Sequence, residues 1–327
     1  MVMERNTHID GRTFFQSSLP SIRTTASTIK MVLLFPEEHY ASLGLQLAGY
    51  SQNTIERTCK ATNENRLKDF CYAGTKTISN LFRDIQDHCL GEFRIVKPDP
   101  LHLICALNFL KKYPTAHALA ARFDGTEKTL LGRVWKYVKA IQALKEKKIQ
   151  WIFNNSNHEE YFIISVDGVH CRIYEPRTQP SSGWYSKKFN KAGVSYELGV
   201  AIHHNKIVWI NGPFPAGQND IKIFRKPGGL MSKIPDDCRA IGDEGYRGEP
   251  SKVSTKNTFN SDELKQFENR VRARHETVNS RLKAFDILGQ VFRTKGTNRM
   301  QYHKSAFEAC CVIVQYEIDN GNELFKV

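Results

Sequence analysis

The sequence predicts an α/β fold, in which a mixed β-sheet flanked by helices follows a helical N-terminal region. Apolar residues recur with helical spacing from about residue 65 to Trp151. After Trp151 the pattern becomes strand-like, with nearly continuous or alternating apolar residues. Two long helical segments follow residue 261. Strands that are followed by helices and short strands are typical of a sheet covered by helices.

The first 150 residues divide into two parts. Residues 1–60 are rich in Ser, Thr and Asn and show little periodicity, so we expect a poorly ordered or loosely packed segment. Residues 61–150 are predicted to be helical and helix-turn-helix-like. Helical patterns cover residues 66–89, with a break at Gly74, and residues 99–113, which end before Pro114.

A pair of helices is predicted over residues 115–144. An Ala-rich helix stops at Asp124-Gly125, and Thr126 can then cap a second helix. Two short helices joined by a turn that contains glycine have the form of a helix-turn-helix, whose second helix would enter a DNA groove. A plain helical hairpin that only packs against its neighbour is an equal alternative.

Residues 151–327 are predicted to form the sheet and its covering helices. Strand patterns occur at residues 161–168, 194–204, 206–214 and 239–246, with a short helix at 220–224. A long helix is expected over residues 261–288, and its apolar residues Val271, Val278, Leu282 and Phe285 predict one buried stripe. The last helix, residues 300–318, is apolar around much of its circumference and should pack on the sheet.

Charge is the unusual feature of the composition. The chain of 327 residues has a formal net charge of +13 and a pI of about 9.3, which predicts affinity for a polyanion, most plausibly nucleic acid. A ribosomal or membrane-surface protein would also be basic. No apolar run is long enough to span a membrane, and "MVLLF" at 31–35 is too short for a signal-peptide core.

The cysteines indicate a reducing compartment. The eight cysteines form no CxxC pair and no zinc-like spacing, and they fall inside apolar runs such as "EACCVIV". We therefore expect buried free thiols in a soluble, intracellular protein.

Three carboxylates form the candidate catalytic set. Asp167 in "ISVDGVH" and Asp243 in "AIGDEGY" follow apolar strands, and Glu276 lies among arginines in "RARHETVNSRLKAF". Singly, each Asp-Gly favours an ordinary turn, and Glu276 favours a surface ion pair with Arg272 or Lys283. As a set they suit Mg²⁺, provided that the two strands lie side by side and the long helix carries Glu276 over the strand ends. Two ions about 4 Å apart would clamp the attacking and leaving oxygens of a phosphodiester.

Five motifs, taken in order, carry a family resemblance. They are "VDGVHCRIYEP", "GWYSKKFNKAGVSYELGV", "IVWINGPFPAGQNDIKIF", "AIGDEGYRG" and "RVRARHETVNSRLKAF". The series resembles the catalytic domain of PIF/Harbinger-type DDE transposases over about residues 163–315. The resemblance implies an RNase H-like fold, with Asp167, Asp243 and Glu276 as catalytic residues and metal ligands. Two departures are Val169, where the family often has Thr, and Glu244, where it commonly has Ser or Lys.

The resemblance also implies a function. A DNA transposase of this family would use two Mg²⁺ ions, with Mn²⁺ as a substitute, to nick transposon ends, and the freed 3′-hydroxyl would then attack target DNA. Terminal inverted repeats, a Myb-like helper protein and a nuclear setting are further implications, and a homodimer is one option for the assembly. A domesticated derivative that binds DNA or protein without cutting, and a nuclease without strand transfer, are the alternatives.

Other residues are assigned smaller roles. Lys187, Lys188 and Lys191, with aromatic residues between them, suit contacts to a DNA backbone, and a solvated loop is an equal alternative. His170 and His275 are interpreted as structural, and Asp220 as the N-cap of the helix at 220–224. The remaining predicted DNA contacts are Arg247, Arg272, Arg274, Lys283, Lys128, Arg133 and Lys136.

Overall fold

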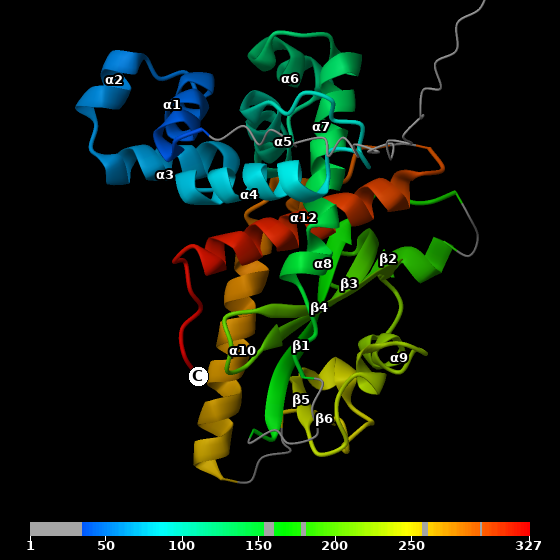
Figure 1. The fold of residues 1–327 in the computed structure, drawn as a ribbon. Helices are drawn as coiled ribbons and strands as arrows, with labels where there is room; N and C mark the ends of the chain where they lie inside the picture. Colours follow the sequence, from blue (N-terminus) through cyan, green and yellow to red (C-terminus); the bar gives the residue numbers. More distant parts are fainter. Residues whose placement is uncertain (1–34, 154–159, 178–180, 257–260, 295) are drawn as a thin grey trace, which may run out of the picture. The chain divides into compact units, whose positions relative to one another are not determined.

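The computed structural model describes residues 35–153, 160–177, 181–256, 261–294 and 296–327, and Figure 1 follows the chain through them. The described residues all belong to one unit of mutually contacting segments. Residues 1–34, which include most of "MVLLF" and of the segment predicted to be loosely packed, lie outside the described residues.

In the described chain before residue 150 every regular element is a helix. We call this part the helical region. Its helices are α1 (Glu37–Leu47), α2 (Gln52–Arg57), α3 (Lys60–Cys71), α4 (Thr75–His88), α5 (Pro100–Lys112), α6 (Ala116–Phe123), α7 (Glu127–Ala143) and α8 (Lys145–Lys148). Of these, α1 differs from the loose packing expected for residues 1–60. Tyr40 and Leu45 of α1 are buried, and the Tyr40 ring lies 5.8 Å from the ring of Phe82, centroid to centroid. Burial of these apolar side chains against α4 orders α1.

The predicted turn between two helices is confirmed at α6 and α7. The helix α6 ends at Asp124, whose backbone is left-handed with φ of 48°. The Thr126 hydroxyl then accepts a hydrogen bond from the backbone N–H of Thr129 and caps α7. Of the predicted apolar side of α7, Leu130, Val134, Val138 and Ile141 are buried.

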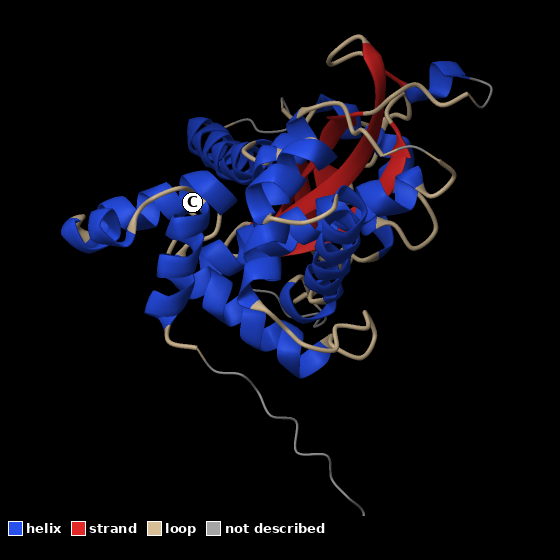
Figure 2. Ribbon diagram, turned by 90° about the horizontal axis from the view of Figure 1, so that it is seen from above, coloured by secondary structure: helices blue, strands red, loops and turns tan. Residues whose placement is uncertain are grey.

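A mixed six-stranded sheet follows and confirms the predicted fold class. Its strands are β1 (Phe162–Arg172), β2 (Tyr185–Ser186), β3 (Lys191–Ala201), β4 (Ile207–Pro215), β5 (Arg239–Gly242) and β6 (Val253–Ser254). The strand β3 pairs with β1, β2 and β4 in the antiparallel sense, whereas β1 pairs with β5, and β5 with β6, in the parallel sense. Figure 2 shows the strands in red with helices beside them. This arrangement is consistent with a DDE nuclease fold.

Two long helices complete the chain. They are α10 (Asp262–Lys283) and α12 (Arg299–Asp319), separated by the short α11 (Asp286–Gly289). All four residues of the predicted stripe on the first helix, from Val271 to Phe285, are fully buried. The helix ends earlier than predicted because Phe285 adopts an extended backbone, with its ring 4.1 Å from that of Tyr72 in α3's C-cap.

The helix α12 connects the helical region with the sheet. It contacts α4, α7 and α8, and it also contacts β4 and α10 (Figure 1). The ring of Tyr196 on β3 stacks on Phe307 of α12 with centroids 3.7 Å apart. As a result, the largest apolar core contains residues from both the helical region and the sheet. The predicted boundary at residue 150 therefore falls between two parts that share a core.

A second apolar core supports the sheet next to α9 (Asp220–Phe224) and the 3₁₀ turn η3 (Glu244–Tyr246). It contains Val166 of β1, Ala240 of β5, Phe224 and Tyr246. The rings of Phe224 and Tyr246 meet edge to face, 5.8 Å apart. This packing holds α9 and η3 together beside β1 and β5.

The sequence also led to expectations about the cysteines and about membrane-spanning segments. All eight cysteines are free, and seven are buried, with Cys59 exposed at the N-cap of α3. None of the helices in the described ranges combines the length and the hydropathy needed to cross a bilayer.

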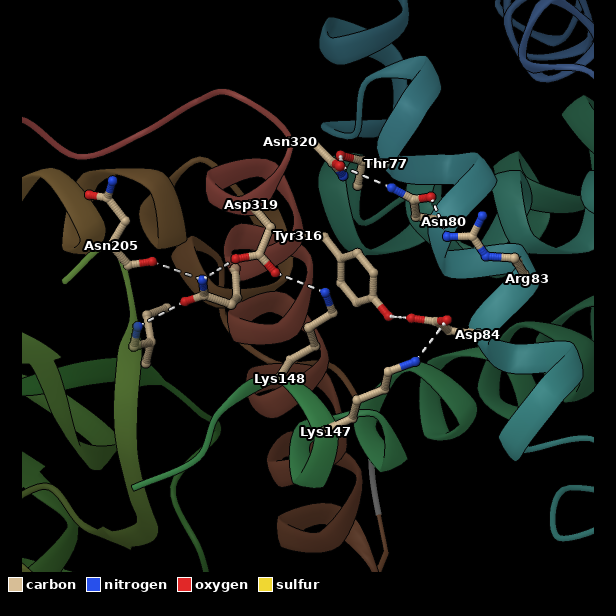
Figure 3. A network of polar contacts seen from close by, with 12 residues as sticks. Thr77, Asn80, Arg83, Asp84, Lys147, Lys148, Asn205, Tyr316, Asp319 and Asn320 are labelled. Atoms are coloured by element: carbon tan, nitrogen blue, oxygen red, sulfur yellow. Dashed lines mark hydrogen bonds and ion pairs between the residues drawn. The ribbon is translucent and has the colours of Figure 1, made fainter. Parts of the chain in front are cut away.

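A network of polar contacts joins α12 to α4 and α8 (Figure 3). Tyr316 of α12 and Lys147 of α8 both donate hydrogen bonds to the carboxylate of Asp84 on α4. Farther along, Lys148 donates to Asp319 at 2.8 Å, and Asn320 donates to Thr77 at 3.0 Å. Burial alone would raise the pKa of Asp84, but the bonds from Tyr316 and Lys147 outweigh it and lower the pKa.

We expect Tyr316→Phe to lower the free energy of unfolding by about 1–3 kcal/mol near pH 7, because the buried Asp84 carboxylate loses a donor. Urea denaturation followed by circular dichroism measures the change. Since the folded-state pKa of Asp84 is depressed, the difference should shrink as the pH falls below its ordinary value of 3.8. Tyr185→Phe, at an exposed tyrosine, is the control and should change stability little. A loss that is equal in both variants would contradict the role of Asp84.

Candidate active site

The parallel pairing of β1 with β5 brings two of the predicted acids together. This pairing ends at Val166 opposite Gly242, and the next residues on the two strands are Asp167 and Asp243. The prediction that the two strands lie side by side is confirmed. The prediction that Asp167 ends its strand is wrong, because β1 continues to Arg172 in antiparallel pairing with β3. Asp167 therefore lies where β1 loses its parallel neighbour.

Hydrogen bonds fix both aspartates. Asp167 accepts from the backbone N–H of Gly168 at 2.7 Å and from the side-chain amide of Asn279 at 2.8 Å. Asp243 accepts from the backbone N–H of Gly245 at 2.9 Å. Asn279 is buried on α10, one turn after Glu276. The bond from Asn279 to Asp167 was not predicted from the sequence.

The three predicted acids line one small cavity. Asp167, Asp243 and Glu276 surround a space of about 60 Å³, which Arg272 and His275 also line. Glu276 is exposed. Arg272 pairs with Glu268 at 3.6 Å, and within the described residues Glu276 has no basic partner within 4.0 Å. The surface ion pair that was the alternative for Glu276 is therefore not formed with Arg272 or Lys283.

His275 supports the cavity from below. Its Nδ1 lies 2.8 Å from the hydroxyl of Ser165 on β1, and the side chain is buried. Burial lowers the pKa of His275 in spite of the neighbouring acids. A neutral, buried histidine that joins α10 to β1 agrees with the structural role predicted for it.

A fourth carboxylate, Asp220, lies beside the two aspartates. Its predicted role as a helix N-cap is wrong, because Asn219 occupies that position and Asp220 is the first residue of α9. A Cβ built on Gly168 would lie 2.7 Å from one oxygen of Asp220, and a Cβ on Gly245 would lie 2.7 Å from the other. The carboxylate thus fills space that the two glycines leave open. Burial, then the charge of Asp243, raises the pKa of Asp220 to about 6.

Glu197 extends this acidic group into the sheet. It lies on β3 opposite Gly168 and is 1% exposed, and it accepts a hydrogen bond of 2.8 Å from the indole N–H of Trp209. Burial raises the pKa of Glu197 to about 7 despite that bond, and the charge of Asp220 adds to the effect. No pattern in the sequence indicated a role for Glu197, because a single polar residue is ordinary in a strand.

Lys188 is a basic residue close enough to act on these acids. Its ammonium donates to the carbonyl of Gly168 at 3.1 Å, and its charge lowers the pKa of Asp220 in opposition to burial. The backbone N–H of Lys188 donates to Ser186, whose hydroxyl lies 2.9 Å from Nδ1 of His170. Burial, and then Lys188, lower the pKa of His170 to about 4, so this histidine is neutral and structural.

The other predicted DNA contacts fall into two groups. Exposed side chains are Lys128, Arg133, Lys136, Lys187, Lys191, Arg247 and Lys283. Arg274 is buried and donates to the carbonyls of Phe325 and His204, so the prediction of a DNA contact for it is wrong. Its guanidinium instead ties the C-terminal segment to α10. Arg247 forms an ion pair with Glu244, which neutralises that extra carboxylate.

A separate acidic cluster occurs at α4. In the part of the chain that the structure describes, Asp84, Asp87 and His88 offer ligand atoms that all lie within 4.8 Å of one another. The ammonium of Lys147 already lies 3.0 Å from the carboxylate of Asp84 and 3.4 Å from Nε2 of His88. A cation would have to displace that charge, and we therefore assign no metal to the cluster.

The donor set around the 60 Å³ cavity fits hard divalent cations. Carboxylate oxygens are the ligands that Mg²⁺ prefers, and Asp167, Asp243 and Glu276 supply three such groups from three elements. The ligand atoms of these three acids do not all lie within 4.8 Å of one another, unlike those of the cluster at α4. A pair of ions about 4 Å apart needs ligands more widely spread than one ion does.

One comparison with known proteins gave a match. A family model described as DDE superfamily endonuclease matches residues 166–315. The match contains all three predicted acids and begins after the helical region. Searches among curated proteins and among solved structures gave no match. The matched segment supports a nuclease or transposase function, and an endonuclease family implies DNA as the substrate.

We expect Asn279→Ala to weaken Mn²⁺ binding about 10–100-fold, because Asp167 loses the donor that orients it. Electron paramagnetic resonance of free Mn²⁺ during a titration measures the affinity. Asn269→Ala, at an exposed asparagine on the same helix, is the control. Equal Mn²⁺ affinity in the Asn279 variant and the unmodified protein would show that the orienting bond is unimportant.

Glu197→Gln should stabilise the protein at high pH. Because burial raises the folded-state pKa to about 7 from the ordinary 4.5, the native protein loses stability as the pH rises through this interval. Gln keeps an acceptor for Trp209 and carries no charge, so its advantage should grow up to roughly 3 kcal/mol above pH 7. Urea denaturation at pH 5 and pH 8 measures it, with the exposed Glu146→Gln as control. A difference that does not vary with pH would contradict the assignment.

Proposed function

We propose that the chain is a Mg²⁺-dependent DDE-type nuclease that acts as a DNA transposase, cutting transposon ends and joining them to target DNA. The observation that carries the proposal is the convergence of Asp167, Asp243 and Glu276 on one cavity within the segment that matches DDE endonucleases. Asp167 lies on β1, Asp243 directly follows β5 and Glu276 lies on α10, so only the folded chain brings them together.

The proposed site divides the chemistry between bound cations and the chain. Two Mg²⁺ ions, or Mn²⁺ as a substitute, would activate water or a 3′-hydroxyl and neutralise charge on the phosphate. Asp167, Asp243 and Glu276 would hold these ions. Asn279 and the N–H of Gly168 orient the carboxylate of Asp167, and Arg272 at the cavity offers a cation to a neighbouring phosphate.

Basic side chains are proposed to hold the DNA on two surfaces. Beside the acids, Lys187, Lys188 and Lys191 would contact the backbone, together with Arg247, Arg272 and Lys283. On α7, the exposed Lys128, Arg133 and Lys136 would contact DNA if α6 and α7 act as a helix-turn-helix. The confirmed turn between these helices supports that option, and the packing of Leu130 and Val134 is compatible with a plain hairpin as well.

The remaining features are proposed from the family resemblance. They are the PIF/Harbinger subtype, terminal inverted repeats as the substrate, a Myb-like helper protein, a homodimer and a nuclear location in a eukaryotic cell. The runner-up function is a domesticated, catalytically silent derivative that binds DNA or protein. Val169 and Glu244 depart from the family pattern and favour it, whereas the three acids are intact.

Nicking of supercoiled plasmid with Mg²⁺ tests the proposal. We expect the unmodified protein to nick, and Asp243→Asn and Glu276→Ala to lose activity by at least about 10³-fold while DNA affinity is retained. Glu244→Gln is the matched control, because this carboxylate neighbours Asp243 but pairs with Arg247. Joining of a labelled 3′-hydroxyl oligonucleotide to the plasmid separates a transposase from a nuclease.

The alternatives predict different results. A protein that binds DNA but never nicks it with Mg²⁺ or Mn²⁺ would support the silent derivative and reject the enzyme. Nicking without joining would reject transposition. If Glu276→Ala retains full activity, the assignment of the third acid is wrong.

A further inference from the structure

A large cavity lies between the helical region and residues 293–302, apart from the acids. It has a volume of about 810 Å³ and shares no lining residue with the carboxylate cavity. The connection between α5 and α6, one side of α7, the segment at 293–294 and the start of α12 enclose it. Cavities of roughly 300–1,000 Å³ are the size that binds small molecules and single chemical groups of larger ligands.

Aromatic rings form much of the cavity wall. Phe109, Tyr113, Trp135 and Tyr302 all line it. Trp135 packs edge to face against Phe109 at 5.7 Å and against Tyr302 at 4.6 Å, centroid to centroid. These contacts hold the indole in one orientation while leaving it partly exposed. Phe109 and Tyr113 are buried, whereas Trp135 and Tyr302 are partly exposed, and a rigid, partly exposed ring is suited to stacking against a flat apolar group.

The charges on the wall are mostly positive. Arg94, Lys136, Lys139 and Arg293 line the cavity, whereas Glu92 is its one acidic residue. Arg293 lies over the ring of Tyr113 at 3.9 Å and Lys139 over that of Tyr302 at 5.1 Å, so cations and rings alternate along the wall. The fitting ligand therefore combines flat rings with negative charge.

Gly132 keeps one side of the cavity open. It lies on α7 in the cavity wall, and a Cβ built on it would meet no atom within 4 Å. Glycine in the middle of a helix destabilises the helix relative to alanine. At this position the missing side chain leaves space beside Trp135.

We propose that this cavity binds unpaired nucleotides of a DNA strand, with bases stacked on Trp135 and its aromatic neighbours and phosphates held by Lys136 and Lys139. The charge complementarity favours a polyanion over an apolar peptide. A paired duplex hides its base faces, whereas an unpaired strand presents base faces and phosphates together. The inference is independent of the cutting reaction proposed for the acids, and its test uses no metal.

Fluorescence anisotropy with labelled oligonucleotides tests the inference. The probes are a twelve-residue oligothymidylate and an abasic strand of equal length, which keeps the phosphates but lacks the bases. We expect the protein to bind the strand with bases at least about fivefold more tightly, since stacking contributes roughly 1–3 kcal/mol per base. Equal affinity for the two strands would overturn the proposal, because phosphate contacts alone would then explain binding.

Variants of residues in the cavity wall test whether the preference for bases arises in this cavity. Gly132→Leu should fill the cavity from an open helical position and reduce the preference for bases at least about fivefold, and Trp135→Ala should do the same. Gly132→Ala is the size control and should keep the preference. Lys128→Ala, on the same helix but outside the cavity, should weaken both strands equally and also keep it.

Folding is checked by circular dichroism, because Trp135 packs against other rings and its loss can disturb them. Gly132→Leu keeps the ring contacts of Trp135. If Trp135→Ala unfolds, the Gly132→Leu variant therefore tests the proposal by itself. An unchanged preference in folded Gly132→Leu would show that bases bind elsewhere. Loss of plasmid nicking in Asp243→Asn with base preference intact would separate this site from the catalytic one.

Discussion

The register between β1 and β5 is the constraint on which the candidate site depends. Because Val166 lies opposite Gly242, the chain places Asp167 and Asp243 at the same level of two adjacent parallel strands. On the other side, β1 continues for several residues against β3, which keeps the backbone of Asp167 extended and rigid. A shift of one residue in the parallel pairing would turn one of the two carboxylates to the opposite face of the sheet.

The helix α10 adds the third acid while it performs three tasks on different sides. Val271, Val278 and Leu282 bury one stripe. His275 and Asn279 reach polar groups of β1, at Ser165 and Asp167. Arg270, Arg274 and Arg281 bind carbonyls of the C-terminal segment. The position of Glu276 is therefore fixed by its neighbours on the helix, although its own side chain is exposed.

Local patterns were sufficient for much of the fold. The turn at Asp124 and the cap at Thr126 were predicted because each depends on residues within a few positions. The α/β fold class and the buried stripe of α10 followed from apolar periodicity. The grouping of Asp167, Asp243 and Glu276 around one cavity was suggested by ordered motifs and by strand and helix patterns, which also depend on sequence order.

Contacts between distant segments were the ones that the sequence could not supply. Asn279 lies more than a hundred residues from Asp167, and no local pattern links them. Arg274 resembled the other basic residues of its helix, because the carbonyls that it binds belong to the β3–β4 connection and to the C-terminal segment, far away in the chain. Asp220 was assigned as an N-cap on local propensity, whereas its carboxylate lies beside Gly168 of β1 and Gly245 of η3. The periodicity of apolar residues does not reveal which polar residues form bonds between distant parts of the chain.

The carboxylate of Asp220 rests between Gly168 and Gly245, and this has a consequence for how such a chain can evolve. Any side chain at either glycine would push into the oxygens of Asp220, so the three positions are coupled by volume alone. Replacement of Asp220 by a smaller residue would release Gly168, whereas a Cβ at Gly245 would still lie 2.9 Å from an oxygen of Asp243. In descendants of this sequence, substitution of residue 168 should therefore follow the loss of the Asp220 carboxylate and should not precede it.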